Sequence, residues 1–321
     1  MKKQTEQFNN FLQQQNFIKE PKNLYTPIDY MMELGGKRIR PILCIMGNQL
    51  FESNEHPTLN AALAIEIFHN FTLVHDDIMD EAPIRRGQPT IQHKYGLNTA
   101  ILSGDLMMIW AYQYLEKVGT QYLLDVFTLF NKTAAQVCDG QQWDMDFEER
   151  QDVTIPEYIT MIEHKTAVLL AASLKMGAII GNATKEEAED LYKFGKNIGI
   201  AFQLQDDYLD AYANAEKFGK KVGGDIAQNK KTFLLLKALA KANPTQHTEL
   251  QKLITTKPTN ETEKIQAVLS IYNDLDIKEE TRQQMKSYHD KALKALSNIQ
   301  APQEKKQPLL DIVNLLMGRD V

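Results

Sequence analysis

The amino-acid sequence predicts an all-α protein. Its 321 residues include only 11 prolines and 16 glycines, whereas the strong helix formers Ala, Leu, Lys, Gln and Glu are abundant. No proline interrupts residues 157–243. Hydrophobic residues make up 43% of the chain, which is enough to fill one sizeable core. We therefore expect a single helical domain over residues 1–321.

The helices follow from the spacing of apolar residues and from the positions of Pro and Gly. Ala61, Ile65 and Phe68 recur at helical spacing. No breaker intervenes before Pro83, so a helix is expected from about residue 57 or 58 to Asp80. Further helices are expected over residues 97–115, 122–142, 155–181 and 185–212.

Two segments are expected to be loops. Residues 81–96 contain two prolines and two glycines, which favour turns. Residues 213–225 are polar and Gly-rich, and such a segment can close over phosphates as a lid. From about residue 245 to the end the sequence is rich in Lys, Glu and Gln, so we expect amphipathic helices that provide packing and solvated surface.

Composition and charge exclude several classes of function. The formal net charge of −6 argues against a nucleic-acid partner. No apolar run approaches the roughly 18 residues of a membrane span, so no transmembrane segment is expected. The first six residues are polar and lack the apolar stretch of a secretory signal, so the expected location is the cytoplasm. Cys44 and Cys138 lack metal-binding or disulfide spacing and are expected to be buried thiols.

One acidic motif occurs twice in the predicted helices. The copies are Asp76-Asp77-Ile78-Met79-Asp80 and Asp206-Asp207-Tyr208-Leu209-Asp210. The first and last aspartates of each copy are four residues apart and share a helix face. A single copy is more often a solvated face, but two copies, each flanked by apolar residues, favour a function. Because clustered carboxylates repel and their hard oxygen ligands suit Mg²⁺, the motifs predict Mg²⁺ sites that bind a diphosphate.

A basic cluster precedes the first acidic motif. In Gly35-Gly36-Lys37-Arg38-Ile39-Arg40-Pro41, three cations follow two glycines. Such a cluster can bind an anion, although a solvated turn is the alternative when it is taken alone.

The ordered set of motifs resembles that of the trans-isoprenyl diphosphate synthases. Between Gly35 and Lys230 the chain carries Gly-Gly-Lys-Arg-x-Arg-Pro, His-x(6)-Asp-Asp-x-x-Asp, Arg-Arg-Gly, Gly-Gln-x-x-Asp, Lys-Thr and Phe-Gln-x-x-Asp-Asp-x-x-Asp. The resemblance implies an isoprenoid synthase-like helical bundle around a deep central cavity, with the motifs in about residues 35–230. It also implies an enzyme that joins isopentenyl diphosphate head to tail to an allylic diphosphate, releases pyrophosphate, and uses about three Mg²⁺ ions per active site.

The resemblance assigns roles to individual residues. The implied metal-binding set is Asp76, Asp77, Asp80, Asp206, Asp207 and Asp210. Within it, Asp77 and Asp210 are expected to orient metal-bound water and neighbouring cations. The cations implied to grip the allylic diphosphate are Arg85, Lys165 and Lys220, although a shift of one residue would give the last role to Lys221.

Two further sets contact substrate by the same resemblance. The residues implied to bind or line the allylic substrate are Gln141, Asp144, Thr166, Gln203 and Lys230. The residues implied to form a metal-free pocket for isopentenyl diphosphate are Lys37, Arg40, His69 and Arg86.

Product length is expected to depend on the helix before Asp76. At about 1.5 Å per residue, Phe68 lies about 12 Å from Asp76 and can close the cavity that holds the growing chain. In the family the residue five before the motif often sets the length. Here it is Phe71, followed by the small Thr72, a pattern that looks like archaeal geranylgeranyl-type enzymes. A twenty-carbon product is therefore expected; the alternatives are a fifteen-carbon product and a purely structural role for both phenylalanines.

Two other functions remain to be weighed. A class I terpene cyclase usually carries a different second metal motif, whereas this chain has a second Asp-Asp-x-x-Asp. A catalytically silent partner subunit of a prenyl synthase typically loses one acidic motif, and this chain keeps both. A homodimer is expected from the resemblance and from the apolar stretch of residues 101–110.

Overall fold

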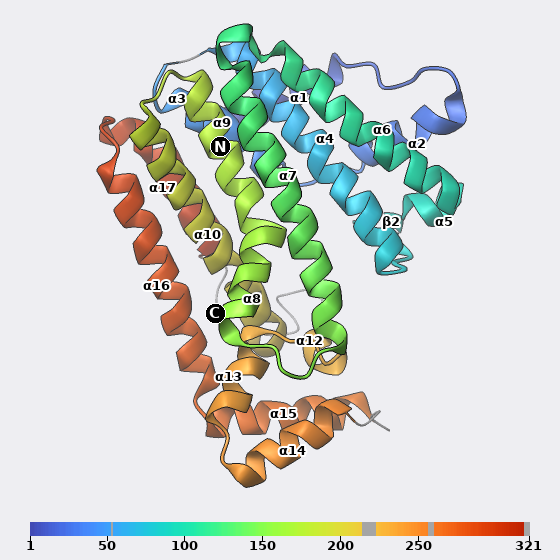
Figure 1. Cartoon of the computed structure of the whole chain (residues 1–321), viewed down its shortest axis with the longest axis vertical. Coiled ribbons are helices and arrows are strands. Elements are labelled where there is room, and N and C mark those ends of the chain that lie inside the picture. Colours follow the sequence, from blue (N-terminus) through green and yellow to red (C-terminus); the bar gives the residue numbers. More distant parts are fainter. Residues whose placement is uncertain (53, 214–222, 256–259, 318–321) are drawn as a thin grey trace. The chain divides into compact units, whose positions relative to one another are not determined.

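The structure is a computed structural model that describes residues 1–52, 54–213, 223–255 and 260–317. In this part of the chain every element is helical except for one antiparallel hairpin, β1–β2 (Figure 1). The predicted all-α class is therefore confirmed. No described helix combines the length and the apolar character that crossing a membrane requires.

The chain divides into two compact units, which are described separately. Unit 1 comprises Met1–Asn131, Ala172–Tyr192 and Gln300–Leu309, and unit 2 comprises Lys132–Ala171, Lys193–Ile299 and Leu310–Val321. The single-domain organisation stays a prediction.

The elements are distributed over the units as follows. Unit 1 holds α1 (Lys2–Gln13), α2 (Lys22–Glu33), α3 (Ile39–Gln49), α4 (Glu55–Met79), β1 (Ile84–Arg85), β2 (Gln88–Pro89), α5 (Ile91–Tyr95), α6 (Leu97–Leu115) and η1 (Glu116–Val118). Unit 2 holds α8 (Ile155–Ile162), the π-helical turn η2 (Glu163–Ala167), α12 (Gly224–Ala227), α13 (Phe233–Lys241), α14 (Pro244–Thr255), α15 (Glu261–Asp274) and α16 (Ile277–Asn298). Residues of α7 (Thr120–Glu149), α9 (Val168–Ile180), α10 (Lys185–Tyr212) and α17 (Gln303–Met317) belong to both units.

Helix α4 is the central helix of unit 1. It packs between α3 and α6 and runs beside α6 in Figure 1. Its residues 58–68 are all buried, and this stretch is rich in Ala and Ile, which allows close packing on every side. The helix ends at Met79, where Glu81 adopts a positive φ of 50° and Pro83 follows. The first acidic motif therefore lies at the end of a rigid, buried helix.

The predicted helices are present, with some differences in their bounds and continuity. Helices α6 and α10 begin and end as predicted, and α7 is longer at both ends. The single helix expected over residues 155–181 is instead divided into α8, a π-helical turn and α9. The loop expected over residues 81–96 contains the hairpin β1–β2 and the short helix α5, because Gly87, at a positive φ of 77°, closes a tight turn.

Glycines bring α3 and α9 into backbone contact in unit 1. A Cβ atom on Gly177 would lie 2.0 Å from the carbonyl oxygen of Cys44, and one on Gly47 would lie 2.3 Å from that of Leu174. Cys44 is buried between these helices, and burial raises the pKa of its thiol, so the prediction of a buried thiol is confirmed there. It is wrong for Cys138, which lies on the solvent face of α7 and is exposed.

In unit 2, helix α15 joins the short helix α12 to the C-terminal helices. It packs against α12, α13, α14 and α16. Figure 1 shows α13, α14 and α15 in orange, with α14 and α15 side by side. The shared core includes Leu235, Leu250, Val268 and Tyr272, all of them buried. The amphipathic C-terminal helices expected from the sequence are therefore present.

Candidate active site

In the first acidic motif the middle aspartate is buried and the outer ones are accessible. The Asp77 residue is 3% exposed, whereas the Asp76 side chain is 21% exposed and Asp80 is exposed. Arg85, on β1, donates from Nε to both carboxylate oxygens of Asp77, at 2.8 and 2.9 Å, and its Nη2 lies 3.5 Å from Asp76 Oδ2. Burial raises the pKa of Asp77, and Arg85 opposes that shift.

The hairpin brings Arg85 back to the end of α4. Gln92, on α5, donates to the carbonyl oxygen of Asp77 at 2.7 Å, and the Thr90 hydroxyl donates to that of Ala82 at 2.8 Å. These contacts fix the hairpin against the motif. Arg85, which the sequence assigned to the diphosphate, pairs here with the motif's own carboxylates.

Two residues of the predicted isopentenyl pocket meet beside α4. Arg40 Nη1 lies 3.1 Å from His69 Nε2. Burial, followed by the charges of Arg40, Arg86 and other arginines, lowers the pKa of His69 well below its usual value, so the imidazole is neutral. Burial also lowers the pKa of Arg40 to about 10; Glu66 opposes this shift and Arg86 adds to it. Among the described residues, Arg40 Nε is buried without a hydrogen-bond partner.

A buried ion pair that sequence reasoning missed supports this pocket. Arg38 donates from Nη1 to Glu66 Oε1 at 2.5 Å and from Nη2 to the Met32 carbonyl at 2.5 Å. Both side chains of the pair are at most 6% exposed. Asn70 also donates to Glu66 Oε1, at 3.2 Å. Arg38 has a positive φ of 49° and precedes α3, so the ion pair fixes the turn that carries the exposed Lys37.

Arg86 joins the same cluster through the two glycines of the basic motif. Its Nη1 donates to the carbonyl oxygen of Gly35, and a Cβ atom on Gly36 would lie 2.9 Å from its guanidinium carbon. The cluster therefore holds three guanidinium groups, those of Arg38, Arg40 and Arg86. Glu66 pairs with Arg38, and its negative charge favours the charged forms of Arg40 and Arg86. This excess of positive charge can bind a multiply charged anion.

The residues expected to limit product length form an aromatic cluster. Phe68 is 1% exposed, and its ring centre lies 5.6 Å from that of Phe71 and 5.1 Å from that of Phe130 on α7. Phe71 packs in turn on His75, at 4.8 Å. The Thr72 hydroxyl donates to the carbonyl oxygen of His69 at 2.8 Å, so this small side chain is bonded to its own helix.

The second acidic motif repeats the arrangement of the first with a different donor. Asp207 is 5% exposed, and Asp206 and Asp210 are partly exposed. The hydroxyl of Tyr158, a buried residue of α8, donates to Asp207 Oδ2, and Gln203 Nε2 lies 3.4 Å from Oδ1. Sequence reasoning missed Tyr158, although its place seven residues before the predicted Lys165 is a usable signal.

Burial sets the protonation of this middle aspartate. Burial raises the pKa of Asp207 to about 7, whereas the hydrogen bond from Tyr158 and the charge of Lys230 act in the opposite direction. Because the folded pKa lies above the unfolded value, the carboxyl favours the folded state at low pH and loses that contribution as the pH rises through about 7.

The π-helical turn carries Lys165 and Thr166 between two glycines. Lys165 donates to Asp144 Oδ2 at 2.6 Å, and Thr166 donates to Gln203 Oε1 at 3.4 Å. A Cβ atom on Gly140 of α7 would lie 2.2 Å from the backbone nitrogen of Lys165, and one on Gly199 of α10 would lie 2.6 Å from the Cα atom of Ala167. The glycine of the Gly-Gln-x-x-Asp motif therefore lets α7 touch the turn, with Gln141, partly exposed, next in sequence.

A short segment, residues 223–230, lies beside the second acidic motif. Two backbone N–H groups of this segment donate to Asp210. Gly223 N donates to the Asp210 carbonyl at 2.6 Å, and Asp225 N donates to Asp210 Oδ2 at 2.9 Å. Burial raises the pKa of Asp225, Lys230 opposes this shift, and Asp210, Asp144 and Asp206 add to it. Asp225 is thus a further carboxylate beside the second motif that the sequence analysis did not assign. Lys220 and Lys221 lie outside the described residues.

The donor set of both motifs fits Mg²⁺. In each motif the middle carboxylate is bonded to a protein donor, and the first and fifth remain accessible on one helix face. Among the described residues no three His, Cys, Asp or Glu side chains group closely enough to hold a metal. Mg²⁺ commonly binds through one or two carboxylates and takes its other ligands from water and substrate phosphates. A pair of accessible aspartates fits that mode.

Comparisons with known proteins give the family context. The polyprenyl synthetase model matches residues 21–272. The chain is 43% identical over 226 residues to geranylgeranyl diphosphate synthase of Methanosarcina mazei, covering 70% of each chain. It is 38% identical over 239 residues to geranylfarnesyl diphosphate synthase of Natronomonas pharaonis, covering 69% of this chain and 70% of that one. A crystal structure of geranylgeranyl pyrophosphate synthase matches with a TM-score of 0.94 at 42% identity, covering 100% of this chain and 99% of that one.

Tyr158→Phe tests the bond to Asp207, because it removes the hydroxyl and keeps the buried ring. We expect the free energy of unfolding to fall by about 1.5 to 3 kcal/mol at about pH 8, where the carboxylate has lost a donor. The folded variant has the higher Asp207 pKa and binds more protons near neutral pH, so its deficit should shrink toward about pH 6. Urea unfolding without Mg²⁺, followed by circular dichroism, measures both values.

Tyr25→Phe is the matched control, because this tyrosine stacks on Trp110 in unit 1. Its effect on unfolding should not depend on pH over this range. A Tyr158→Phe deficit that stays constant between about pH 6 and pH 8 would contradict the link to Asp207.

Proposed function

The chain belongs to the polyprenyl synthetase family and is a prenyltransferase, and from this premise we propose that it condenses isopentenyl diphosphate head to tail with an allylic diphosphate. The allylic C–O bond breaks, a C–C bond forms to isopentenyl diphosphate, and pyrophosphate and one proton leave. The proposal includes about three Mg²⁺ ions per active site and a cytoplasmic location. A catalytically silent partner subunit is not supported, since both acidic motifs are present and the relatives are named synthases.

The observation that carries this proposal is the repeated arrangement of the acidic motifs. Each presents a first and a fifth aspartate on one face, while the middle aspartate is held by Arg85 in one case and by Tyr158 in the other. Mg²⁺ bound to the accessible aspartates would neutralise the charge that develops on the departing pyrophosphate. The middle aspartates Asp77 and Asp207 would then position the motifs and not bind the metal directly.

The chain's own cations and dipoles assist the same step. We propose that Arg85, Lys165 and Lys230 turn toward the diphosphate when it binds. Arg85 lies beside Asp76, Lys165 is bonded to Asp144, and Lys230 opposes the rise in the pKa of Asp207. The Thr166 hydroxyl and the Gln203 amide lie 3.4 Å apart and can direct their dipoles to the allylic cation. The released pyrophosphate is the proposed acceptor of the final proton.

The cationic cluster of unit 1 supports a metal-free pocket for isopentenyl diphosphate. Glu66 pairs with Arg38, and its charge also acts on Arg40 and Arg86, while the neighbouring imidazole of His69 is neutral. The pocket therefore has an excess of positive charge, which the negative charge of a diphosphate would neutralise. The exposed Lys37 at its rim can add a further contact.

The metal assignment is tested by Asp76→Ala and Asp206→Ala. Each change removes an accessible carboxylate and no core packing. We therefore expect the activation barrier to rise by about 2 to 4 kcal/mol, which lowers turnover, with little loss of stability. Product formation at saturating Mg²⁺ and thermal unfolding measure the two effects. The matched control is Asp105→Ala, which removes an exposed aspartate of α6. Near-normal turnover in either motif variant would refute the assignment.

We propose a twenty-carbon product, limited by the aromatic cluster of Phe68 and Phe71. The relatives bear names for twenty- and twenty-five-carbon products, so family membership alone does not choose a length. Phe68 supports a floor because it is buried and packs on Phe71 and on Phe130 of α7.

Product length is tested with Phe71→Ala, Phe68→Ala and the double variant. Each removes an aromatic ring below Thr72, so we expect longer products, with the largest shift in the double variant. Chromatography of the dephosphorylated products measures the distribution. Phe127→Ala, which alters a partly exposed ring of α7 outside the Phe68–Phe71 pair, is the control. Unchanged lengths in all three variants would place the floor elsewhere.

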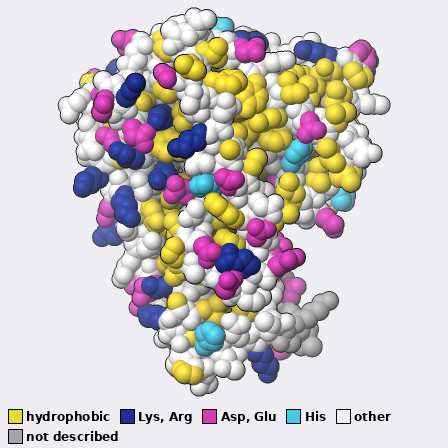
Figure 2. Space-filling model, in the orientation of Figure 1, with side chains coloured by type: hydrophobic (Ala, Val, Ile, Leu, Met, Phe, Trp, Pro, Cys, Tyr) yellow, Lys and Arg dark blue, Asp and Glu magenta, His cyan; other side chains and the backbone are white. Residues whose placement is uncertain are grey.

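We also propose a homodimer, based on an apolar face of α6 and α7. Ile101, Leu102 and Ile109 of α6 are 42%, 56% and 53% exposed, and Leu124 of α7 is 78% exposed. Figure 2 shows hydrophobic side chains gathered over this part of unit 1. Contiguous apolar surface of this kind marks contacts with other proteins.

The dimer predicts a two-chain mass in sedimentation equilibrium at micromolar concentration. Leu102→Glu with Ile109→Glu should shift the equilibrium toward the monomer, because charges enter the apolar face. The control Glu116→Ala changes an exposed charge at the end of α6 and should leave the mass unchanged. A wild-type protein that sediments only as a monomer would rule the dimer out.

A further inference from the structure

Helix α15 carries a buried lysine whose charge has a specific partner. Lys264 is 4% exposed, and its Nζ donates to Asn229 Oδ1 at 2.5 Å and to the carbonyl oxygen of Ala227 at 3.1 Å. Lysine is almost never fully buried unless its charge is satisfied. Both acceptors belong to the segment of residues 223–230, between Asp225 and Lys230.

The same helix also supports the start of this segment. Gly223 has a positive φ of 83°, and a Cβ atom on it would lie 2.8 Å from the Ile265 side chain of α15. One turn further along, Val268 and then Tyr272 line a cavity of about 10 Å³ below the segment, with room for the centre of a single water molecule. Residues 223–230 therefore rest on α15 near both of their ends.

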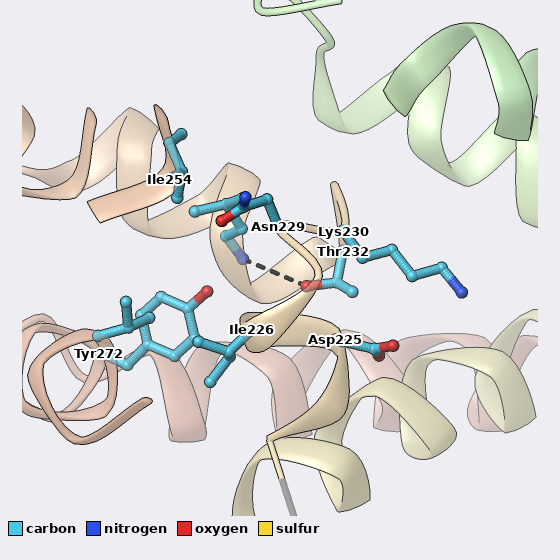
Figure 3. A pocket seen from close by; sticks show the side chains of 9 residues that line it. Asp225, Ile226, Asn229, Lys230, Thr232, Ile254 and Tyr272 are labelled. Carbon is cyan, nitrogen blue, oxygen red and sulfur yellow. Dashed lines mark hydrogen bonds between the residues drawn. The ribbon is translucent and has the colours of Figure 1, made fainter. Parts of the chain in front are cut away.

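The other side of the segment belongs to the second acidic motif. Figure 3 shows Asp225 and Lys230 pointing away from Ile254 and Tyr272. The backbone nitrogen of Asp225 donates to Asp210 Oδ2, and the charge of Lys230 lowers the pKa of Asp225 and of Asp207. A displacement of the segment would move these groups relative to the motif.

We propose that Lys264 is a positioning residue that holds Asp225 and Lys230 at the second acidic motif and so sets the affinity for magnesium diphosphate. The inference rests on the proposed function for the identity of the ligand. It assigns a role to a helix that the sequence analysis treated as packing and solvated surface. Lys264 donates its hydrogen bonds to Asn229 and to Ala227 at the end of α12, and it acts on the motif through these two residues.

Lys264→Met tests the proposal, because methionine keeps the unbranched chain and removes the charge and the donors. Calorimetric titration with pyrophosphate and Mg²⁺ should show affinity weakened by about tenfold, as for residues that orient metal ligands. The KM for the allylic diphosphate should rise by a similar factor, and the KM for isopentenyl diphosphate should stay within about twofold. Lys264→Arg keeps the charge and should restore part of the loss.

Asn229→Ala removes the acceptor from the other side and serves if Lys264→Met does not fold. The double variant, Lys264→Met with Asn229→Ala, should bind pyrophosphate no more weakly than the weaker-binding of the two single variants, because both changes break the same Lys264–Asn229 hydrogen bond. Lys252→Met, at an exposed position of α14, is the matched control and should change neither affinity nor KM.

A lower urea midpoint for Lys264→Met with unchanged pyrophosphate affinity and an unchanged KM ratio would show a purely structural role and overturn the proposal. Equal increases in both KM values would overturn it as well. If the wild type forms no prenyl product, the proposed function fails, and the pyrophosphate titration still decides the role of Lys264.

Discussion

Each acidic motif depends on side-chain hydrogen-bond donors placed against its middle aspartate. Two unit charges 4 Å apart near a protein surface interact by about 4 kcal/mol, so three carboxylates within five helical residues destabilise one another. Arg85 at Asp77 and Tyr158 at Asp207 hold one carboxylate of each motif below the surface. The remaining two stay accessible and at a spacing of one helical turn. One donor is charged and the other is neutral, yet in both motifs the middle aspartate is buried and the outer two are at least partly exposed.

Other features of each unit serve the same arrangement. In unit 1 the hairpin turns at Gly87 so that Arg85 reaches the end of α4, and Gln92 fastens it there. The ion pair of Arg38 and Glu66 ties the basic turn to the same helix, one turn before His69. Helix α4 therefore carries Glu66 and His69 of the cationic cluster and the aspartates of the first motif on one rigid element, which fixes their separation.

The sequence predicted the regular helices well and the irregular backbone poorly. Helices α6 and α10 begin and end where apolar spacing placed them. The hairpin escaped prediction because two-residue strands have no periodicity, and its turn residue reads only as a loop glycine. The π-helical turn escaped prediction because neither Pro nor Gly marks it and the Ala- and Leu-rich α9 that follows favours an uninterrupted α-helix.

The candidate site divides in the same way. Residues in contiguous motifs, such as Asp206 or Lys165, could be predicted because their spacing is local. Tyr158, Asp225 and Lys264 were missed because their partners lie 49, 15 and 35 residues away in the chain. Glu66 left a signal that went unused: a lone carboxylate within an Ala- and Ile-rich stretch of α4 requires a buried cation, and Arg38 supplies it.

The π-helical turn η2 has a consequence for how this site can change over time. A π turn holds one residue more than an α turn, here with Val168 N bonded to the carbonyl oxygen of Glu163. Deleting that residue would restore an α-helix and rotate α8 by about 100° relative to α9. Tyr158 would then leave Asp207, and Lys165 would leave Asp144, in a single event. A side-chain substitution cannot compensate for such a rotation. An insertion or deletion in η2 would therefore change the Tyr158–Asp207 and Lys165–Asp144 contacts together.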